Sequence, residues 1–288
     1  MKRLILFLAA VAMVSTVLAG FKYEGEWEAD FHGLRDVDVA ANGNVYTNES
    51  SDMADTGEDV KYFTPTGSLL GSWHDQSHGI AVAPNGNVYT GGCSASPIRY
   101  YTPSGSLLGS WPPPNTVGTA GGDIAVDGTV YLSVAGILGE VRYYTPAGSL
   151  LGSWPCEYGA LSVSRSNLVY VVSYRDKYVQ YFTSAGSQLG SWSSPGAAGI
   201  AVAPTGEIFV TDYPGCRVFR YTSTGSLIGS WGSRGAGPGM FDGPEGVAVS
   251  PDGKRVYVAD AGNSRVQYFC DDSAIAPASL GEVKTFFR

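Results

Sequence analysis

Short apolar segments alternate with small polar turn residues along most of the chain. Between residues 79 and 111 four such segments follow one another, with Pro84-Asn85-Gly86 after the first and Pro103-Ser104-Gly105 after the third. Alternation of apolar and polar positions indicates half-buried β-strands, and the turn glycines supply the positive φ angles that tight hairpins need. The pattern predicts strands over 79–82, 87–90, 98–102 and 106–111.

This four-segment unit recurs along the chain. Each copy carries one tryptophan, usually in a Gly-Ser-Trp block, and successive tryptophans are 38 to 46 residues apart. The six are Trp27, Trp73, Trp111, Trp154, Trp192 and Trp231. One sheet of four short strands cannot bury its own faces, so units of this length stack around an axis. The sequence therefore predicts an all-β, six-bladed β-propeller of four-stranded antiparallel blades.

The last repeat lacks its fourth segment. Cys270-Asp271-Asp272 follows its third strand, and no Gly-Ser-Trp comes after it. An unmatched Gly-x-Trp lies near the N-terminus, within residues 23–27. We expect 23–27 to pair with 265–269 as the outer strand of the last blade, because closing the ring in one sheet leaves no exposed inner edge.

Two segments lie outside the repeats. A basic Lys2-Arg3 pair, an apolar run over 4–18 and small residues up to Ala19 predict a cleaved signal peptide over 1–19, and the run is short for a bilayer span. The propeller would cover 20–270. The tail, 271–288, contains a capping-box pattern beginning at Ser279 that opens a short amphipathic helix, which either docks on the propeller or is a detachable recognition segment. We expect a secreted or periplasmic monomer with no membrane span after cleavage.

Charge and cysteine content narrow the partners. The net charge is −8, and it falls to −10 if Lys2 and Arg3 leave with the signal peptide. An acidic chain is a poor partner for nucleic acid, which requires a basic face. The four cysteines are expected to be unpaired. Cys93 and Cys216 fall in equivalent loops of opposite blades, beyond the roughly 7 Å that a disulfide spans. Pairing of Cys93 with Cys156 stays open.

The last blade resembles the NHL repeat. The resemblance rests on Gly-Ser-Arg-Gly-Ala-Gly-Pro-Gly-Met-Phe at 232–241, Pro-Glu-Gly-Val-Ala-Val at 244–249 and the segment 258–269, and weaker copies extend over the mature chain to Cys270. In NHL repeats an Asp and an Arg link the second and third strands. The resemblance implies this structural role for Asp260 and Arg265, with Asn263 in the same motif, and for Asp212 and Arg217.

NHL propellers are similar to two groups of enzymes, the amidating lyases and the gluconolactonase-like hydrolases. The lyases imply zinc held by several histidines, but this chain has only His32, His74 and His78, all near the start of the ring. The hydrolases imply Glu, Asp and Asn around the channel, and the first strands here offer no Asn. No nucleophile elbow is present either. The sequence therefore favours a protein without catalysis or cofactor.

Candidate ligand-binding residues come from the register of the repeats. The residues just before the first strands should surround one mouth of the channel: Arg35, His78, Gly122, Gly159, Ala198 and Glu245. Reactive side chains then occupy one arc, over blades six, one and two. Asp36 and Asp38 extend this arc into the first strand, while Asp123 stands alone in the third blade. We expect Arg35 to pair with Glu245 or with Asp36.

Three functions are compatible with this pattern. The leading prediction is a non-catalytic propeller that binds a protein, a peptide or a small polar ligand through Arg35, Asp36, Asp38, His78 and Glu245. The first alternative is a metal-dependent hydrolase or lyase that uses the same mouth, and the second is a structural component of the cell envelope. The acidic loop over 48–59 is expected to be solvated, with Ca²⁺ or another divalent ion as the alternative, since calcium needs six to eight oxygen ligands.

Overall fold

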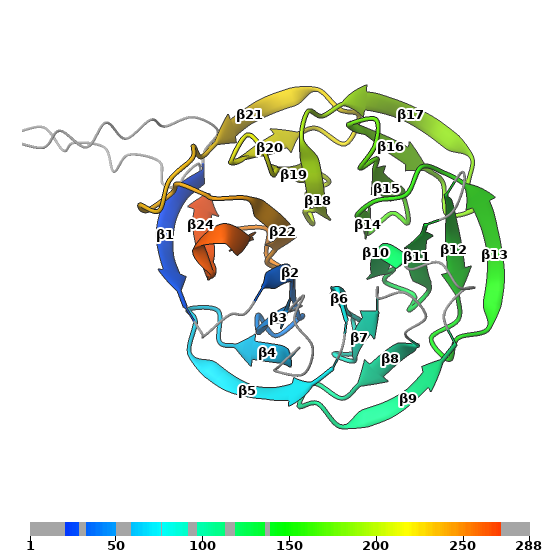
Figure 1. Cartoon of the computed structure of the whole chain (residues 1–288). Coiled ribbons are helices and arrows are strands. Elements are labelled where there is room, and N and C mark those ends of the chain that lie inside the picture. Colours follow the sequence, from blue (N-terminus) through cyan, green and yellow to red (C-terminus); the bar gives the residue numbers. More distant parts are fainter. Residues whose placement is uncertain are drawn as a thin grey trace, which may run out of the picture.

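The computed structural model describes residues 21–28, 33–49, 59–75, 77–91, 97–112, 119–135 and 139–271. Its strands form six four-stranded antiparallel sheets arranged as blades around a central channel (Figure 1), which confirms the predicted six-bladed propeller. The predicted signal peptide, the tail after Asp271, His32, Cys93 and residues 50–58 of the acidic loop lie outside the described residues. No helix in the described ranges is long and apolar enough to cross a bilayer.

Each blade runs from an inner strand at the channel to an outer strand at the rim. The blades are: blade 1, β2 (Leu34–Val39), β3 (Val45–Glu49), β4 (Asp59–Phe63) and β5 (Leu69–His74); blade 2, β6 (Gly79–Val82), β7 (Val88–Gly91), β8 (Ile98–Tyr101) and β9 (Leu107–Trp111); blade 3, β10 (Thr119–Ile124), β11 (Val130–Val134), β12 (Glu140–Tyr144) and β13 (Leu150–Pro155). Blade 4 contains β14 (Leu161–Val163), β15 (Val169–Val172), β16 (Tyr178–Phe182) and β17 (Gln188–Ser193), and blade 5 contains β18 (Ala197–Val202), β19 (Ile208–Asp212), β20 (Arg217–Tyr221) and β21 (Leu227–Trp231).

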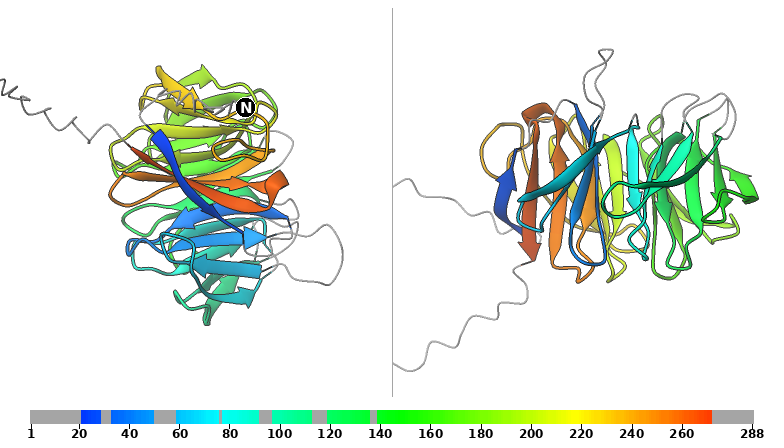
Figure 2. Two further views of the ribbon diagram at one scale, coloured as in Figure 1. Left: turned by 90° about the vertical axis from the view of Figure 1, so that its left-hand side faces the viewer. Right: turned by 90° about the horizontal axis from the view of Figure 1, so that it is seen from below.

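Blade 6 closes the ring with strands from both ends of the chain. It contains β22 (Pro244–Val249), β23 (Arg255–Asp260), the 3₁₀ turn η1 (Ala261–Asn263), β24 (Arg265–Asp271) and, outermost, β1 (Phe21–Trp27). β1 is antiparallel to β24, with Tyr23 opposite Phe269 and Trp27 opposite Val266, and the two strands lie side by side in Figure 2. The predicted closure by 23–27 is therefore confirmed, and it begins two residues earlier, at Phe21.

The repeated tryptophans pack across the seams between blades. Each of the first five lies under the turn glycine between the third and fourth strands of the next blade, as Trp73 does under Gly105. Those glycines have φ angles of 87° to 92°, and a Cβ there would overlap the indole ring. In several blades the hydroxyl of a second-strand tyrosine donates to a carbonyl of the same neighbouring turn, as Tyr46 does to Pro103 at 2.9 Å. The turn between the third and fourth strands therefore also forms part of the contact with the previous blade.

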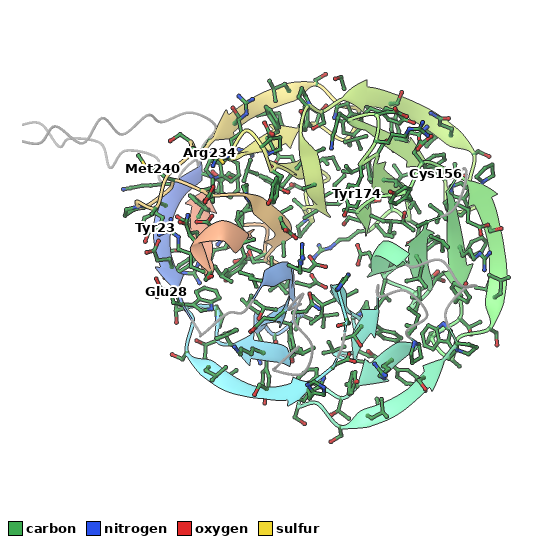
Figure 3. The ribbon with its side chains drawn as sticks, in the orientation of Figure 1. Tyr23, Glu28, Cys156, Tyr174, Arg234 and Met240 are labelled. Atoms are coloured by element: carbon green, nitrogen blue, oxygen red, sulfur yellow. The ribbon has the colours of Figure 1, made fainter. Side chains whose placement is uncertain are left out.

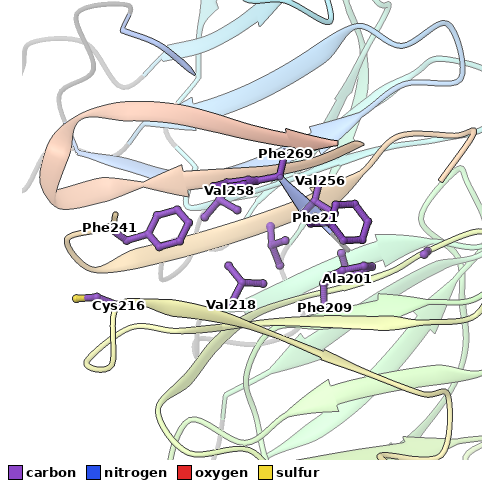
Figure 4. Packing of buried hydrophobic residues seen from close by; sticks show 11 residues of the cluster. Phe21, Ala201, Phe209, Cys216, Val218, Phe241, Val256, Val258 and Phe269 are labelled. Atoms are coloured by element: carbon purple, nitrogen blue, oxygen red, sulfur yellow. The ribbon is translucent and has the colours of Figure 1, made fainter. Parts of the chain in front are cut away.

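Apolar side chains fill the spaces between adjacent blades. Between blades 5 and 6, Phe21 from β1 stacks on Trp231 and meets Phe209 edge-on, with ring centroids 5.6 and 5.3 Å apart. Figure 4 shows this cluster, in which Phe241 and Phe269 lie between the two sheets. Cys156, Cys216 and Cys270 are free thiols, in agreement with the expectation for these three.

Candidate functional site

The six inner strands enclose a cavity of about 530 Å³ on the propeller axis. Its wall includes residues from every inner strand, β2, β6, β10, β14, β18 and β22, which surround the channel in Figure 1. All five predicted ligand-binding residues line it: Arg35, Asp36, Asp38, His78 and Glu245. Ala198 and Gly122 from the predicted ring also line this cavity, whereas Gly159 does not.

The strand pairing defines which channel residues are equivalent. Asp38 is opposite Tyr46 and Asp123 is opposite Tyr131, so the two aspartates occupy the same position of their blades. Together with the corresponding residues of the other blades they form one level of the channel: Asp38, Ala81, Asp123, Ser162, Ala201 and Ala248. Two residues earlier, Asp36 shares a level with glycine in four blades and alanine in one.

This register corrects the sequence prediction for blade 3. Gly122 lies two positions further along its strand than Arg35 does, and Ala120 takes the position equivalent to Arg35. The signal was present in the sequence, because the turn glycines Gly43 and Gly128 each follow their aspartate by five residues. Asp123 is therefore a partner of Asp38 at mid-channel.

The channel carboxylates accept backbone hydrogen bonds from the neighbouring blade. Asp36 Oδ2 accepts the amide of Ile80 at 3.2 Å, and Asp38 Oδ2 accepts that of Val82 at 2.6 Å. Asp123 Oδ2 repeats the arrangement toward blade 4, where it accepts the amide of Val163 at 2.7 Å. Inner strands have no strand partner on the channel side, and buried amides need acceptors. These aspartates therefore join blades 1 and 2 and blades 3 and 4.

Ser162 continues the same connection into blade 5. Its hydroxyl donates to Asp123 Oδ2 at 3.0 Å and accepts the amide of Val202 at 3.2 Å. Asp123, Ser162 and two tyrosines, Tyr174 and Tyr213, line the cavity outside the arc formed by blades six, one and two. The expectation that reactive side chains occupy a single arc is therefore wrong, because the loops between the second and third strands of blades 4 and 5 bring these tyrosines back to the axis.

Polar residues of the second strands hold the linkers that form the mouth. Asn48 Nδ2 donates to Ser77 Oγ at 3.0 Å, and Ser133 Oγ accepts the amide of Gly159 at 3.0 Å. Thr211 Oγ1 donates to the carbonyl of Glu245 at 2.5 Å. Each bond reaches from one blade to the linker before the next blade or to the start of its inner strand, so it holds the backbone at the mouth in place.

An ion pair closes the seam between blades 1 and 6 at the mouth. One guanidinium nitrogen of Arg35, Nη1, lies 3.1 and 3.4 Å from the two carboxylate oxygens of Glu245. The side chains are 35% and 24% exposed, so both still face the cavity. This confirms the expected pairing of Arg35, and its partner is Glu245, 210 residues away in the sequence.

Burial and mutual repulsion favour the protonated forms of the channel acids. The pKa of Asp36 is raised from 3.8 to about 6, chiefly by desolvation and also by the charges of Glu245 and Asp123, against the lowering by its two amide donors. Desolvation also raises the pKa of Asp38 well above 3.8, as does the charge of Asp123. The pKa of Tyr174 is raised by its burial and by Asp36 and Glu245. Part of each shift comes from neighbouring acids, so the acidic groups of the cavity lie close enough to interact.

Aromatic and imidazole groups complete the mouth. Tyr174 lies beside the channel in Figure 3 and packs edge-on against Tyr158, with centroids 6.1 Å apart. His78 and His74 are both exposed, and of the two only His78 lines the cavity. In the described ranges no group of three or more His, Cys, Asp or Glu side chains is placed to hold a metal ion.

The motif residues of blades 5 and 6 lie where their structural role requires. Asp260 Oδ2 accepts hydrogen bonds from Arg265 Nε at 2.9 Å and from Asn263 Nδ2 at 2.8 Å, at the end of the β23–β24 hairpin. Asp212 and Arg217 form the matching 2.8 Å contact between β19 and β20. The buried Arg265 also donates to the Met240 carbonyl at 3.0 Å, so it anchors the preceding linker.

Comparison with known proteins places the chain by its repeat and its fold. Residues 241–269 match the family model of the NHL repeat. Virginiamycin B lyase from Staphylococcus aureus superimposes with a TM-score of 0.62 at 13% identity, over 87% of this chain and 99% of that one. The β-propeller domain of Cps50 (Swd1) from Myceliophteria thermophila gives a TM-score of 0.64 at 10% identity, over 87% and 99% of the two chains.

A streptogramin B lyase has a TM-score of 0.59 at 13% identity, over 86% of this chain and 97% of that one. A comparison with curated proteins finds no match. At such identities the likeness to solved structures concerns the fold. With an NHL repeat in its last blade and six blades of four antiparallel strands, this chain is a six-bladed β-propeller of the NHL-repeat type.

Proposed function

We propose that this propeller is a non-catalytic binding protein, secreted or periplasmic, that holds a small polar ligand in the mouth of its channel. The cavity of about 530 Å³ carries the proposal. Its size falls within the range of roughly 300 to 1,000 Å³ that is typical of small-molecule sites. Arg35, Glu245, Tyr174 and His78 converge on it from four blades. Convergent polar groups in one cavity, among them Tyr174 with its raised pKa, support a binding site.

The hydrogen bonds of the carboxylates favour binding over catalysis. Both oxygens of Asp38 accept amide hydrogen bonds, from Val39 at 2.7 Å and from Val82 at 2.6 Å. Those of Asp36 likewise accept the amides of Val37 and Ile80. A general base must be able to reach the proton that it removes, and these groups are oriented toward the backbone. They shape the cavity and its charge, while the mouth residues contact the ligand.

The proposal is tested by closing the mouth. Ala198 lines the cavity without a functional group of its own, so Ala198→Trp should fill the entrance. Ala147, in an exposed turn on the opposite face, provides the control Ala147→Trp. Purified protein is screened by calorimetry against amino acids, amines, sugars and organic acids.

We expect one compound to bind with a stoichiometry of one. Its affinity should fall at least about tenfold in Ala198→Trp, because a filled pocket excludes its ligand, and remain unchanged in Ala147→Trp. No binding from any class, or binding that Ala198→Trp leaves intact, would overturn the proposal. Hydrolysis of a lactone by metal-loaded protein would replace it with the enzymatic alternative.

A further inference from the structure

The charges around the cavity are unequal. Four carboxylates line it, those of Asp36, Asp38, Asp123 and Glu245, and the fully charged cation that lines it is Arg35. They come from blades 1, 3 and 6. The three aspartates have raised pKa values and accept backbone amides, so Glu245 is the carboxylate that a cation meets at the mouth. The low-dielectric walls strengthen its attraction for a cation.

The mouth already holds one cationic group, supplied by the chain itself. Arg35 contacts both oxygens of Glu245 through Nη1. The two side chains are 35% and 24% exposed, and a partly exposed pair such as this contributes little to stability. Glu245 is held from its backbone by Thr211 Oγ1, so its carboxylate stays at the mouth when its partner leaves. The contact is therefore exchangeable.

Beyond the mid-channel level the wall of the cavity is apolar. Val82, Val163, Val202 and Val249 line it one residue beyond the mid-channel level, and Ala201 and Ala248 leave space between them. A ligand with one charged end and a short aliphatic chain would place the charge near Glu245 and the chain toward these valines. Sugars and dicarboxylic acids match neither the charge nor this wall.

We propose that the ligand of the channel is an organic cation, an alkylammonium or alkylguanidinium compound, whose charged group replaces the Arg35 guanidinium on Glu245. This inference rests on the proposed function and specifies its ligand class. Arg35 then acts as an internal competitor for the site. A cationic ligand must displace the Arg35 guanidinium from Glu245, whereas an anionic ligand would need the Arg35 guanidinium as its partner.

Binding of n-butylguanidinium and n-butylammonium, measured by calorimetry, tests the proposal, with butyrate and n-butanol as matched probes of the other charges. We expect the cations to bind and the other two to fail. Glu245→Gln should weaken cation binding at least about tenfold, because it removes a partly desolvated charge partner. Glu207→Gln is the matched control, since Glu207 also pairs with an arginine, Arg220, at 2.8 Å and is 27% exposed, but lies away from the cavity.

Arg35→Ala distinguishes competition from direct recognition. Loss of the internal competitor should tighten cation binding by about threefold to tenfold, whereas weaker binding in this variant, or binding of butyrate, would overturn the inference. A sugar or an acid that binds the channel and is excluded by Ala198→Trp would leave the proposed function standing and refute the cation. Circular dichroism of each variant establishes that the fold is retained.

Discussion

At the scale of single residues, the channel aspartates serve the fold and set the charge of the site at once. Asp38 and Asp123 occupy equivalent positions and accept amides from the following blade. Alanine stands at this level in three other blades, so the bridge is not a general requirement of the repeat. Both aspartates have a raised pKa, because each is desolvated by burial and lies near other acidic groups.

The raised pKa of Asp36 predicts a stability that falls with rising pH. Its pKa is about 6 in the folded protein and 3.8 ordinarily, so between these values the folded state holds a proton that the unfolded state releases. The contribution is full below about pH 4 and is lost as the pH rises through about 6. Glu245, Asp123, Arg35 and Tyr174 share its surroundings, and the first two act in the same direction.

Denaturant unfolding of Asp36→Asn between pH 4 and pH 7 measures this effect. Between pH 4 and pH 7 the free energy of unfolding of Asp36→Asn should decline less than that of the unmodified protein. The difference between the two declines should be about 1 to 2 kcal/mol after allowance for solvent screening, whatever the difference in stability at pH 4. Asp127→Asn is the control, because Asp127 lies in an exposed turn where two other blades carry Asn42 and Asn85. Parallel profiles for Asp36→Asn and the unmodified protein would show the assignment to be wrong.

At the scale of elements, the turn between third and fourth strands is also the packing surface for the previous blade. Gly105 has a φ of 90°, and a Cβ on it would lie 2.5 Å from the ring of Trp73. Gly206, in the turn between β18 and β19, has a φ of 89° but no atom within 4 Å of that Cβ. The two glycines share a conformation and differ in their neighbours.

Alanine substitutions at these two sites separate strain from packing. Gly206→Ala should cost about 1 kcal/mol, the penalty for a left-handed alanine. Gly105→Ala should cost about 2 kcal/mol more, because the indole must move out of the seam between blades 1 and 2. Chemical denaturation measures both. Equal losses would mean that the tryptophan adapts freely and that the seam is not tightly packed.

At the scale of the whole molecule, closure joins residues separated by almost the full described chain. Glu24 accepts two hydrogen bonds from Arg255, at 2.8 and 2.9 Å, and Glu26 accepts one from Arg265 at 2.8 Å. Phe21 adds its ring to the core between blades 5 and 6. Without β1, β24 becomes an exposed edge and this core opens.

Truncation tests the closure directly. Deletion of residues 1–27 should lower the free energy of unfolding by at least about 5 kcal/mol, since it removes Phe21 and Trp27 from the core together with the paired strand. Deletion of residues 1–20 leaves β1 intact and should cost little. Calorimetric unfolding of the two proteins compares them, and similar transitions would contradict a closing role for β1.

Much of the architecture could be read from local pattern. The spacing of the tryptophans, the turn glycines and the alternation within strands are repeated properties of short segments, and together they predict six blades and the pairing of 23–27 with 265–269. The same reasoning could have aligned Asp123 with Asp38, because the turn glycine was a better reference than the apparent start of the strand.

Other features depend on the ring as a whole. Arg35 meets Glu245 only because the last blade stands beside the first, and Tyr174 reaches the channel because its loop folds back over blade 4. The raised pKa values of Asp36 and Asp38 arise from burial and from charges on other blades. Repeat patterns act over a few residues, and they determine the blades. Desolvation and charge interactions act through space, so the chemistry of the channel exists only once the blades have closed around it.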